Sequence, residues 1–150
     1  MNEIQITPMN ETHIHAIAEI EKQCFSEPWS EKALAEELSV PSAVFLTALM
    51  DGQVAGYMGV HHLGDCAYVC NVAVFPEYRR RSAASALMEA QIQKARACGM
   101  NEITLEVRTS NAAARALYEK FGFVRLGTRP NFYSSPKENA EIYSLYLTDL

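Results

Sequence analysis

The sequence between Cys70 and Ala95 decides the fold, and its first part reads Cys70-Asn-Val-Ala-Val-Phe-Pro-Glu-Tyr-Arg79-Arg-Arg-Ser82-Ala-Ala84. Val72 and Val74 are β-branched and precede a turn at Pro76, which is typical of a strand that ends there. Apolar residues then recur at the spacing of a helix, namely Ala84, Leu87, Met88, Ile92 and Ala95. The stretch therefore predicts a strand, a loop and a helix in that order.

The loop in this stretch carries three consecutive arginines, Arg79–Arg81, followed by small residues at the helix start. The first N–H groups of a helix have no partner within the helix, and the helix dipole favours an anion beside them. A phosphate group often binds in such a place. The alternative is a basic turn exposed to solvent. The helix directly behind the loop favours the anion site.

Turn and capping signals divide the rest of the chain. Asp51-Gly52 is a strong hairpin signal, and Ser30 and Gly99 are residues that commonly cap helix ends. We expect strands over residues 4–9, 43–50, 54–62, 67–74, 102–107, 123–128 and 142–147, and helices over residues 12–25, 30–38, 82–98 and 111–121. The hairpins predict antiparallel strands in the first half, whereas the helix-linked central strands are expected to be parallel. This order indicates an α/β or α+β fold with a mixed sheet, in one domain over residues 1–150.

Length, composition and charge limit the classes of protein. The chain has 150 residues, 49% of them hydrophobic, and a formal net charge of −5 at pH 7. The apolar content is enough for a full core, and the negative charge argues against nucleic acids or anionic membranes as partners. No apolar run reaches membrane-spanning length, and the N-terminus has no signal-peptide pattern. We expect a soluble cytoplasmic protein.

The four cysteines, at positions 24, 66, 70 and 98, form no CxxC pair. No second cluster of cysteine and histidine completes a zinc-binding set. His61-His62 also lacks a carboxylate at a metal-binding spacing. The sequence therefore predicts reduced thiols and no metal site.

Glu106 lies in the middle of a predicted strand that reads Ile103-Thr-Leu-Glu-Val107. Alternation along a strand puts Ile103, Leu105 and Val107 on one face and Glu106 on the other. A carboxylate is uncommon in the centre of a sheet, so Glu106 is a candidate for acid–base chemistry. Arg108 shares its face, and an ion pair between Glu106 and Arg108 explains the pattern equally well.

Asn111, Arg115 and Tyr118 are spaced four and three residues apart, so we expect them on one face of a helix. Asn111 and Tyr118 would then lie about 10 Å apart along the helix axis, which suits an elongated ligand. The alternative for Tyr118 is packing as a half-buried aromatic residue. Trp29 also has two interpretations, a core anchor or a lid over a substrate groove.

Together these residues resemble the GNAT superfamily of acetyl-CoA-dependent N-acetyltransferases, over nearly the whole chain. The block from Leu105 to Tyr118 is specific for enzymes that acetylate protein N-termini, whereas the arginine loop is a looser mark of the superfamily. The matching segments are Phe25-Ser-Glu-Pro28-Trp29-Ser30, Asn71-Val-Ala-Val74, Pro76-Glu-Tyr78-Arg79, Leu105-Glu106-Val107-Arg108, Ser110-Asn111-Ala-Ala-Ala, Ala116-Leu117-Tyr118-Glu119, Gly122-Phe123 and Arg129-Pro-Asn131-Phe-Tyr133.

This resemblance implies a GNAT-like mixed sheet, mostly antiparallel and flanked by helices, with a parallel central strand pair. It implies transfer of an acetyl group from acetyl-CoA to the N-terminal α-amine of a protein. The expected acceptor is the N-terminal alanine of a small-subunit ribosomal protein. The alternatives are acetylation of a small amine or a lysine, and a module that binds CoA without catalysis.

The resemblance also implies roles for individual residues. Glu106 would be the general base, and Tyr118 the general acid toward the leaving thiolate. Trp29, Asn131 and Tyr133 would shape the acceptor peptide site. The acetyl group, the pantetheine and the pyrophosphate of the cofactor would be bound by Val72, Ala73, Val74, Arg80, Arg81, Ser82, Ala83, Ala84, Ser85 and Asn111.

The phosphate loop departs from the family pattern at one position. Its first glycine is Ser82 here, and the second is Ala84, which the family tolerates. A Cβ at Ser82 crowds a place where backbone approaches phosphate. The hydroxyl of Ser82 could instead bind a phosphate oxygen or cap the helix that begins here. The sequence leaves these three alternatives open.

Overall fold

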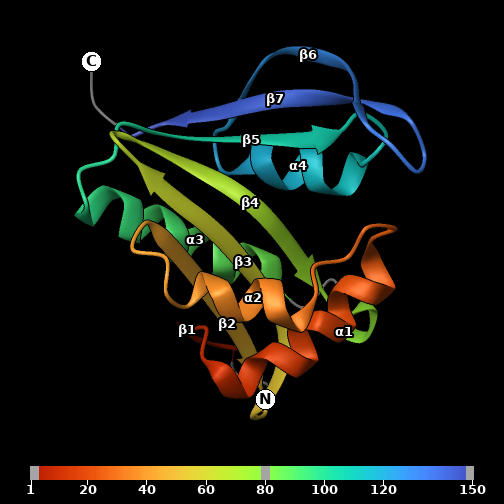
Figure 1. The fold of residues 1–150 in the computed structure, drawn as a ribbon. Helices are drawn as coiled ribbons and strands as arrows, with labels where there is room; N and C mark the ends of the chain where they lie inside the picture. Colours follow the sequence, from red (N-terminus) through yellow and green to blue (C-terminus); the bar gives the residue numbers. More distant parts are fainter. Residues whose placement is uncertain (1–3, 79–81, 148–150) are drawn as a thin grey trace.

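A seven-stranded sheet with helices on both faces forms the described part of the chain, residues 4–78 and 82–147, in the computed structural model (Figure 1). The strands are β1 (Ile4–Pro8), β2 (Ala43–Met50), β3 (Gln53–Leu63), β4 (Cys66–Val74), β5 (Glu102–Arg108), β6 (Val124–Tyr133) and β7 (Glu138–Tyr146). The helices are α1 (Ile14–Cys24), α2 (Glu31–Glu37), α3 (Ala83–Ala97) and α4 (Ala112–Lys120), with 3₁₀ turns η1 (Glu11–His13) and η2 (Pro76–Tyr78).

The strand order in the sheet is β1-β2-β3-β4-β5-β7-β6. Every neighbouring pair is antiparallel except β4 and β5, which are parallel and are connected through α3. A parallel pair needs such a crossover because the second strand must start at the same edge of the sheet as the first. The predicted mixed sheet, mostly antiparallel with one parallel central pair, is confirmed.

The local signals in the sequence act as expected. Asp51 and Gly52 both have positive φ angles, 52° and 78°, in the turn between β2 and β3. Such angles match the twist of the flanking strands in a two-residue hairpin. Ser30 caps α2, because its hydroxyl accepts a hydrogen bond from the Ala33 N–H at 3.1 Å.

Two apolar cores cover the two faces of the sheet. Leu87 and Met88 of α3 pack with Leu105 of β5 and with Tyr118 of α4 on one face. The other face carries a second cluster in which α1 and α2 pack on the sheet, and its members include Ile17, Ile20, Leu34, Phe45 and Tyr57. The ribbon shows the same division, with α1 and α2 on one side of the sheet and α3 and α4 on the other (Figure 1).

The parallel pairing of β4 and β5 is short. It joins Cys66–Tyr68 to Glu102–Thr104 and extends no further in the described residues. Further along β4, the register with β3 shifts so that Asn71 lies opposite Gly59 and Cys70 is the extra residue of a β-bulge. The two strands separate beyond this point (Figure 1). A wedge therefore opens in the middle of the sheet.

The last hairpin is longer than the sequence indicated. The predicted strands over 123–128 and 142–147 are β6, which continues to Tyr133, and β7, which begins at Glu138. Pro130 interrupts the sequence pattern, but β6 is an edge strand, where a residue without an N–H is tolerated. The pairing with β7 shifts between Arg129 and Tyr133, and Asn131 there has a φ of 55°.

The contact between β3 and β4 depends on the absence of a side chain at Gly56. A Cβ at this position would lie 2.7 Å from the Ala73 carbonyl oxygen and 3.1 Å from the Val74 Cα, both of which are backbone atoms. We predict that Gly56→Ala lowers the free energy of unfolding by about 1–3 kcal/mol, the usual cost of overpacking. Urea denaturation of both proteins measures the change.

Gly127→Ala is the control, because a Cβ at Gly127 of β6 meets no atom within 4 Å. It should change the free energy of unfolding by less than about 0.5 kcal/mol, as surface substitutions usually do. Equal losses in the two variants would contradict the close approach of β3 and β4 at Gly56.

Candidate active site

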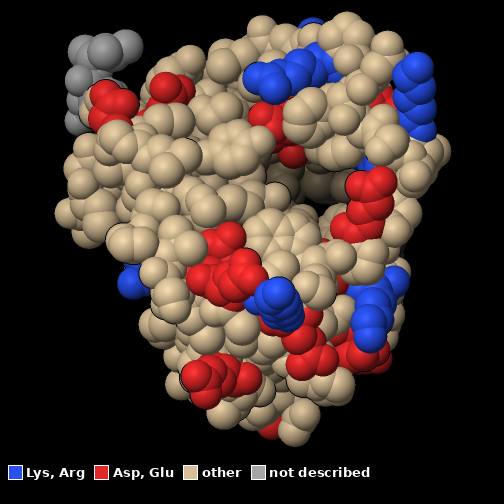
Figure 2. Space-filling view, viewed as in Figure 1, with Lys and Arg blue, Asp and Glu red and all other residues tan. Residues whose placement is uncertain are grey.

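A pocket of about 620 Å³ lies in the wedge between β4 and β5. Its walls come from the connection between α1 and α2, from β4, from the end of β5 with α4, and from the turn between β6 and β7. The space-filling view shows a hollow here, between α4 and β5 on one side and α1 on the other (Figure 2). Both acidic and basic side chains lie around its rim.

Glu106 lies on the face of β5 opposite the buried Ile103 and Leu105, as strand alternation predicted. Ile103, Leu105 and Val107 are buried, whereas Glu106 is partly exposed and lines the pocket. The hydroxyl of Tyr68 on β4 donates a hydrogen bond to Glu106 Oε2. Burial and this hydrogen bond raise the pKa of Tyr68, so its hydroxyl remains a donor at neutral pH. One oxygen of the Glu106 carboxylate is thus held by a side chain of the neighbouring strand.

Arg108 forms an ion pair with a different carboxylate from the one suggested by the sequence. Its guanidinium lies 3.3 Å from Glu138 Oε1, on β7. It also donates to the carbonyl oxygens of Pro136 at 2.9 Å and Ser134 at 3.2 Å, and lies 4.4 Å from the centre of the Tyr133 ring. The ion pair between Glu106 and Arg108 is therefore absent from the described residues. Arg108 instead holds the turn between β6 and β7.

Tyr118 of α4 combines the two alternatives that the sequence left open. Its side chain is 3% exposed, and its ring packs against Phe123 and Tyr143 with centroids 5.7 and 6.3 Å apart. The same residue lines the pocket. Burial, and the phenol of Tyr133 nearby, raise the pKa of Tyr118. Tyr118 is thus both a core residue and a protonated phenol facing the site.

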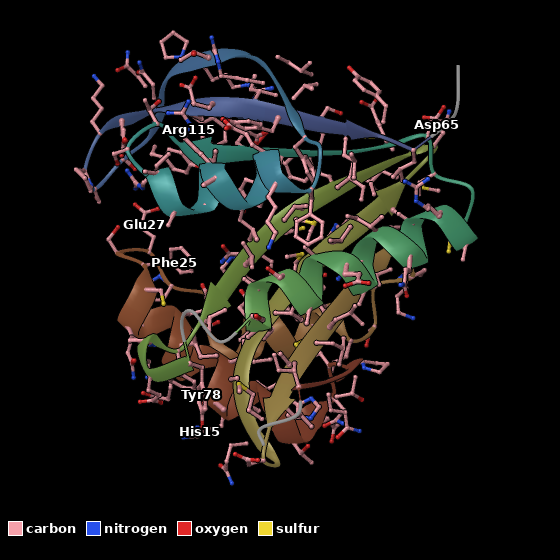
Figure 3. All side chains as sticks on the ribbon, turned by 180° about the vertical axis from the view of Figure 1, so that it is seen from behind. His15, Phe25, Glu27, Asp65, Tyr78 and Arg115 are labelled. Carbon is pink, nitrogen blue, oxygen red and sulfur yellow. The ribbon has the colours of Figure 1, made fainter. Side chains whose placement is uncertain are left out.

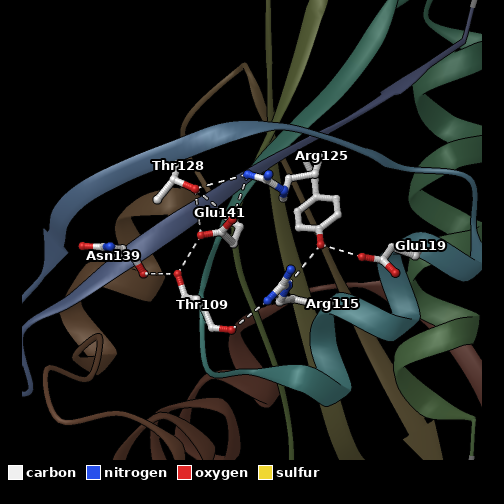
Figure 4. A network of polar contacts seen from close by, with 8 residues as sticks. Thr109, Arg115, Glu119, Arg125, Thr128, Asn139 and Glu141 are labelled. Carbon is white, nitrogen blue, oxygen red and sulfur yellow. Dashed lines mark hydrogen bonds and ion pairs between the residues drawn. The ribbon is translucent and has the colours of Figure 1, made fainter.

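Asn111 lines the pocket from the start of α4, where its Oδ1 accepts a hydrogen bond from the Ala114 N–H at 3.1 Å. Arg115 does not share this position. It donates to the Tyr143 hydroxyl at 3.1 Å and to the Thr109 carbonyl oxygen at 3.0 Å (Figure 4). Of the three residues expected on one helical face, Asn111 and Tyr118 line the larger pocket, whereas Arg115 contacts β7. Ala114, four residues before Tyr118, lines the pocket between them.

Arg115 belongs to a polar network on the β7 side of α4. The Tyr143 hydroxyl donates to Glu119 Oε2 at 2.6 Å, and the buried Glu141 accepts from Thr109 at 2.7 Å (Figure 4). Arg125 and Thr128 of β6 complete the surroundings of Glu141. The network fastens α4, and with it Tyr118, to β7.

A second, smaller pocket of about 270 Å³ lies at the start of α3. It is lined by Val74, Tyr78, Ser82, Ala83, Ala84, Ser85, Ala113 and Leu117. The first intrahelical hydrogen bond runs from the Ala86 N–H to the Ser82 carbonyl oxygen. The N–H groups of residues 83–85 therefore have no acceptor within the helix. Both pockets lie along β4 and α4, which together form an elongated site.

Ser82 has a φ of 69°, in the left-handed region that favours glycine, and its side chain makes no capping hydrogen bond. Of the three alternatives for Ser82, the helix cap is therefore excluded, because the left-handed backbone differs from the extended conformation of an N-cap residue. Arg80 and Arg81, the other expected phosphate ligands, lie outside the described residues.

The residues expected to bind the acceptor differ in position. Trp29 is half-buried, packs on Phe45 at 5.9 Å between ring centroids, and lines the larger pocket, so it is both core anchor and wall. Tyr133 lines the same pocket. Asn131 lines neither pocket, and its N–H donates to Asn139 Oδ1 at 2.9 Å.

The three residues of β4 that were expected to contact the cofactor lie in different surroundings. Val72 lines the larger pocket and Val74 the smaller one. The side chain of Ala73 is buried in the core under α1, as alternation along a strand requires. Ala73 therefore has only its backbone to offer a ligand.

The sequence missed several residues of the larger pocket, among them Tyr68 and Glu27. Glu27 and Phe25 lie on the α1 side of the opening, across from α4 (Figure 3). Ser26 donates to the Ser135 carbonyl oxygen at 2.6 Å, which connects the segment after α1 to the turn between β6 and β7. Alternation along β4 puts Tyr68 on the same face as Cys70, and the sequence shows this much. That Tyr68 contacts Glu106 follows only from the parallel pairing of β4 with β5.

Within residues 4–78 and 82–147, no group of three or more histidine, cysteine, aspartate or glutamate residues is arranged to hold a metal ion. No helix of the described chain is both long enough and apolar enough to cross a membrane.

Comparison with known proteins identifies the family. The family described as "Acetyltransferase (GNAT) family" matches residues 14–123, more than two thirds of the chain. A Bacillus subtilis protein provisionally assigned as a [ribosomal protein bS18]-alanine N-acetyltransferase is 36% identical over 130 residues, 86% of each chain. The Escherichia coli K12 protein of that description is 34% identical over 142 residues, 93% of this chain and 95% of its own.

The fold leads to the same family. The crystal structure of the ribosomal-protein-S18-alanine N-acetyltransferase from Escherichia coli matches with a TM-score of 0.89 at 33% identity, over 100% of this chain and 96% of that one. The predicted class of enzyme, an acetyltransferase with acetyl-CoA as its co-substrate, is confirmed by these matches. The chain belongs to the GNAT family of acetyltransferases.

Proposed function

We propose that this protein transfers the acetyl group of acetyl-CoA to the N-terminal α-amine of ribosomal protein bS18, at an N-terminal alanine. The relatives that match over most of the chain are described by this activity. The observation that carries the proposal is the position of Glu106, held by Tyr68 where β4 and β5 separate. We further propose that residues 1–150 form one catalytic domain and act in the cytoplasm, where ribosomal proteins are made.

The elongated site suits acetyl-CoA, which supplies an activated acetyl group at one end and phosphates at the other. In this proposal, backbone groups of Val72, Ala73 and Val74 bind the acetyl and pantetheine portion. The N–H groups that begin α3, at Ser82–Ser85, bind the pyrophosphate together with Arg80 and Arg81. Ala83 is buried in the core, whereas the small side chain of Ala84 is only partly buried and lines the smaller pocket. In this proposal Asn111 faces the pantetheine arm from the start of α4.

The proposed chemistry needs two proton transfers. An α-amino group has a pKa of about 8, so it is mostly protonated at neutral pH and must lose a proton before it attacks. Glu106 accepts that proton, directly or through water. Tyr118 donates a proton to the leaving sulfur, and its raised pKa keeps it protonated until then. Trp29 and Tyr133 form the walls past which the acceptor enters.

We predict that Glu106→Gln lowers kcat by about 10²-fold, the usual contribution of a general base, with little change in acetyl-CoA affinity. Release of free thiol measures turnover, and calorimetric titration measures affinity. Glu102→Gln is the control, because Glu102 lies on the same strand and face but contacts Ser144, outside the pocket. Wild-type turnover in Glu106→Gln would remove Glu106 from catalysis.

We predict that Tyr118→Phe lowers kcat at least tenfold and leaves the melting temperature within about 2 °C. The ring keeps its packing on Phe123 and Tyr143, and its hydroxyl has no hydrogen-bond partner among the described residues. Because the pKa of Tyr118 is raised, wild-type kcat should not fall between pH 7 and pH 9.5 through loss of this proton. Tyr146→Phe, on an exposed residue, controls for loss of a phenol. Unchanged kcat in Tyr118→Phe would assign the general acid elsewhere.

The acceptor is tested with bS18 and with peptides of its N-terminus. We expect acetylation of the α-amine when alanine is first, and none when that amine is already blocked. Mass spectrometry of proteolytic fragments locates the acetyl group. Modification of lysine side chains alone, or of small amines in preference to the peptides, would replace the proposed acceptor by one of those classes.

A further inference from the structure

Glu21, in the last turn of α1, is a carboxylate with no exposed surface. Its Oε1 accepts a hydrogen bond from the Trp29 N–H at 2.9 Å. Its Oε2 accepts from the Tyr57 hydroxyl and from Asn71 Nδ2, both at 2.7 Å. None of the ion pairs in the described residues includes Glu21. Three neutral donors therefore surround this buried acid.

Such an arrangement is costly unless every acceptor position is satisfied. Burial raises the pKa of Glu21, while the Trp29 N–H and the Tyr57 hydroxyl act in the opposite direction. An apolar side chain would fill the same place without this desolvation cost. What the carboxylate contributes is therefore the position of the segments that its donors belong to.

Two of those donors belong to different walls of the active site, the connection after α1 and the strand β4. Trp29 lies in the wall formed by the connection between α1 and α2, and residues 25–30 of this connection form no helix or strand. Asn71 directly follows the bulge at Cys70 in β4 and directly precedes Val72. Trp29 and Asn71 both line the larger pocket, whereas Glu21 does not. Glu21 can thus act on the site only through them.

We propose that Glu21 is a positioning residue for acetyl transfer: it fastens the acceptor wall at Trp29 to the β4 segment at Asn71. The distance between these two elements sets how the amine meets the acetyl group, and one carboxylate holds both. This inference rests on the proposed function in assigning Val72–Val74 to the acetyl end and Trp29 to the acceptor side.

The hydrogen bond from Asn71 to Glu21 can be tested by exchanging the donor and the acceptor between the two residues. Glu21→Gln keeps the size and an oxygen for the Trp29 N–H but turns an amide toward the amide of Asn71, so two donors meet. Asn71→Asp instead brings two carboxylates together. The double variant Glu21→Gln/Asn71→Asp restores one donor and one acceptor with their places exchanged. We expect each single variant to raise the acceptor KM at least tenfold, and the double variant to recover to within about threefold of wild type.

Acetyl-CoA affinity should change less than threefold in all three variants, because the nucleotide end binds at α3. Glu19→Gln is the matched control, since Glu19 lies on α1 but is partly exposed and pairs with Lys22. It should behave as wild type. Single variants that lose melting temperature while acceptor KM stays at the wild-type value would overturn the proposal, and so would a double variant no better than either single one.

A second readout does not depend on the acceptor. Trp29 is the only tryptophan of the chain, so intrinsic fluorescence reports on the acceptor wall alone. Glu21→Gln should shift the emission to longer wavelength and increase quenching by acrylamide, and the double variant should reverse both changes. Unchanged emission in folded Glu21→Gln protein would overturn the proposal. If Glu21→Gln does not fold, Asn71→Asp and the double variant decide the same question.

These measurements separate the two proposals. Failure of wild-type protein to acetylate bS18 would refute the proposed acceptor, while the fluorescence of Trp29 would still report on Glu21. Conversely, normal acetylation of bS18 by the single variants, with unchanged KM, would refute the role of Glu21 and leave the acceptor intact.

Discussion

The short parallel pairing of β4 with β5 is the constraint on which the site depends. Three residue pairs join the strands, from Cys66 opposite Glu102 to Tyr68 opposite Thr104, and then the strands part. An opening in the middle of a sheet leaves backbone and side chains without a neighbouring strand, and such groups must find other partners. The helix α3 that connects the two strands also brings its N-terminus to the end of β4. The pocket and the position of the α3 N-terminus beside it therefore arise from one topological feature.

The charged groups around this opening are each held by a contact from another element. Glu106 is held by the Tyr68 hydroxyl, Arg108 by Glu138 and two carbonyl oxygens, and Glu21 by three neutral donors. Such contacts fix the orientation of each group before a ligand arrives. A preorganised site loses less free energy to side-chain ordering when it binds. Glu106, the proposed base, lines the pocket while Tyr68 holds its Oε2.

Tyr118 illustrates how packing and chemistry share one residue. Its ring completes the core with Phe123 and Tyr143, while burial keeps its hydroxyl protonated. The helix that carries it is fastened to β7 by Arg115 and Glu119 (Figure 4). Movement of α4 would disturb the core and this network together. The position of the proposed acid is thus set by the stability of the fold.

Much of the fold and part of the site could be predicted from the sequence, because they depend on local periodicity. Alternation alone placed Glu106 on the face opposite Ile103, and the Asp51-Gly52 turn, the cap at Ser30 and the α3 crossover follow from short-range rules. The motif block around Asn111 likewise indicated the family from the sequence alone. Each of these features involves residues close together in the chain.

The partners of the charged side chains were decided only by the tertiary structure. Arg108 pairs with Glu138, thirty residues on, because β7 and not β6 lies beside β5. Tyr68 reaches Glu106 because pairing ends at Tyr68, and β6 continues past Pro130 because it lies at the edge of the sheet. Strand order, bulges and the point where a pairing ends depend on the packing of the whole core. The sequence by itself determined which elements form and which face each residue takes, whereas long-range packing decided which faces meet.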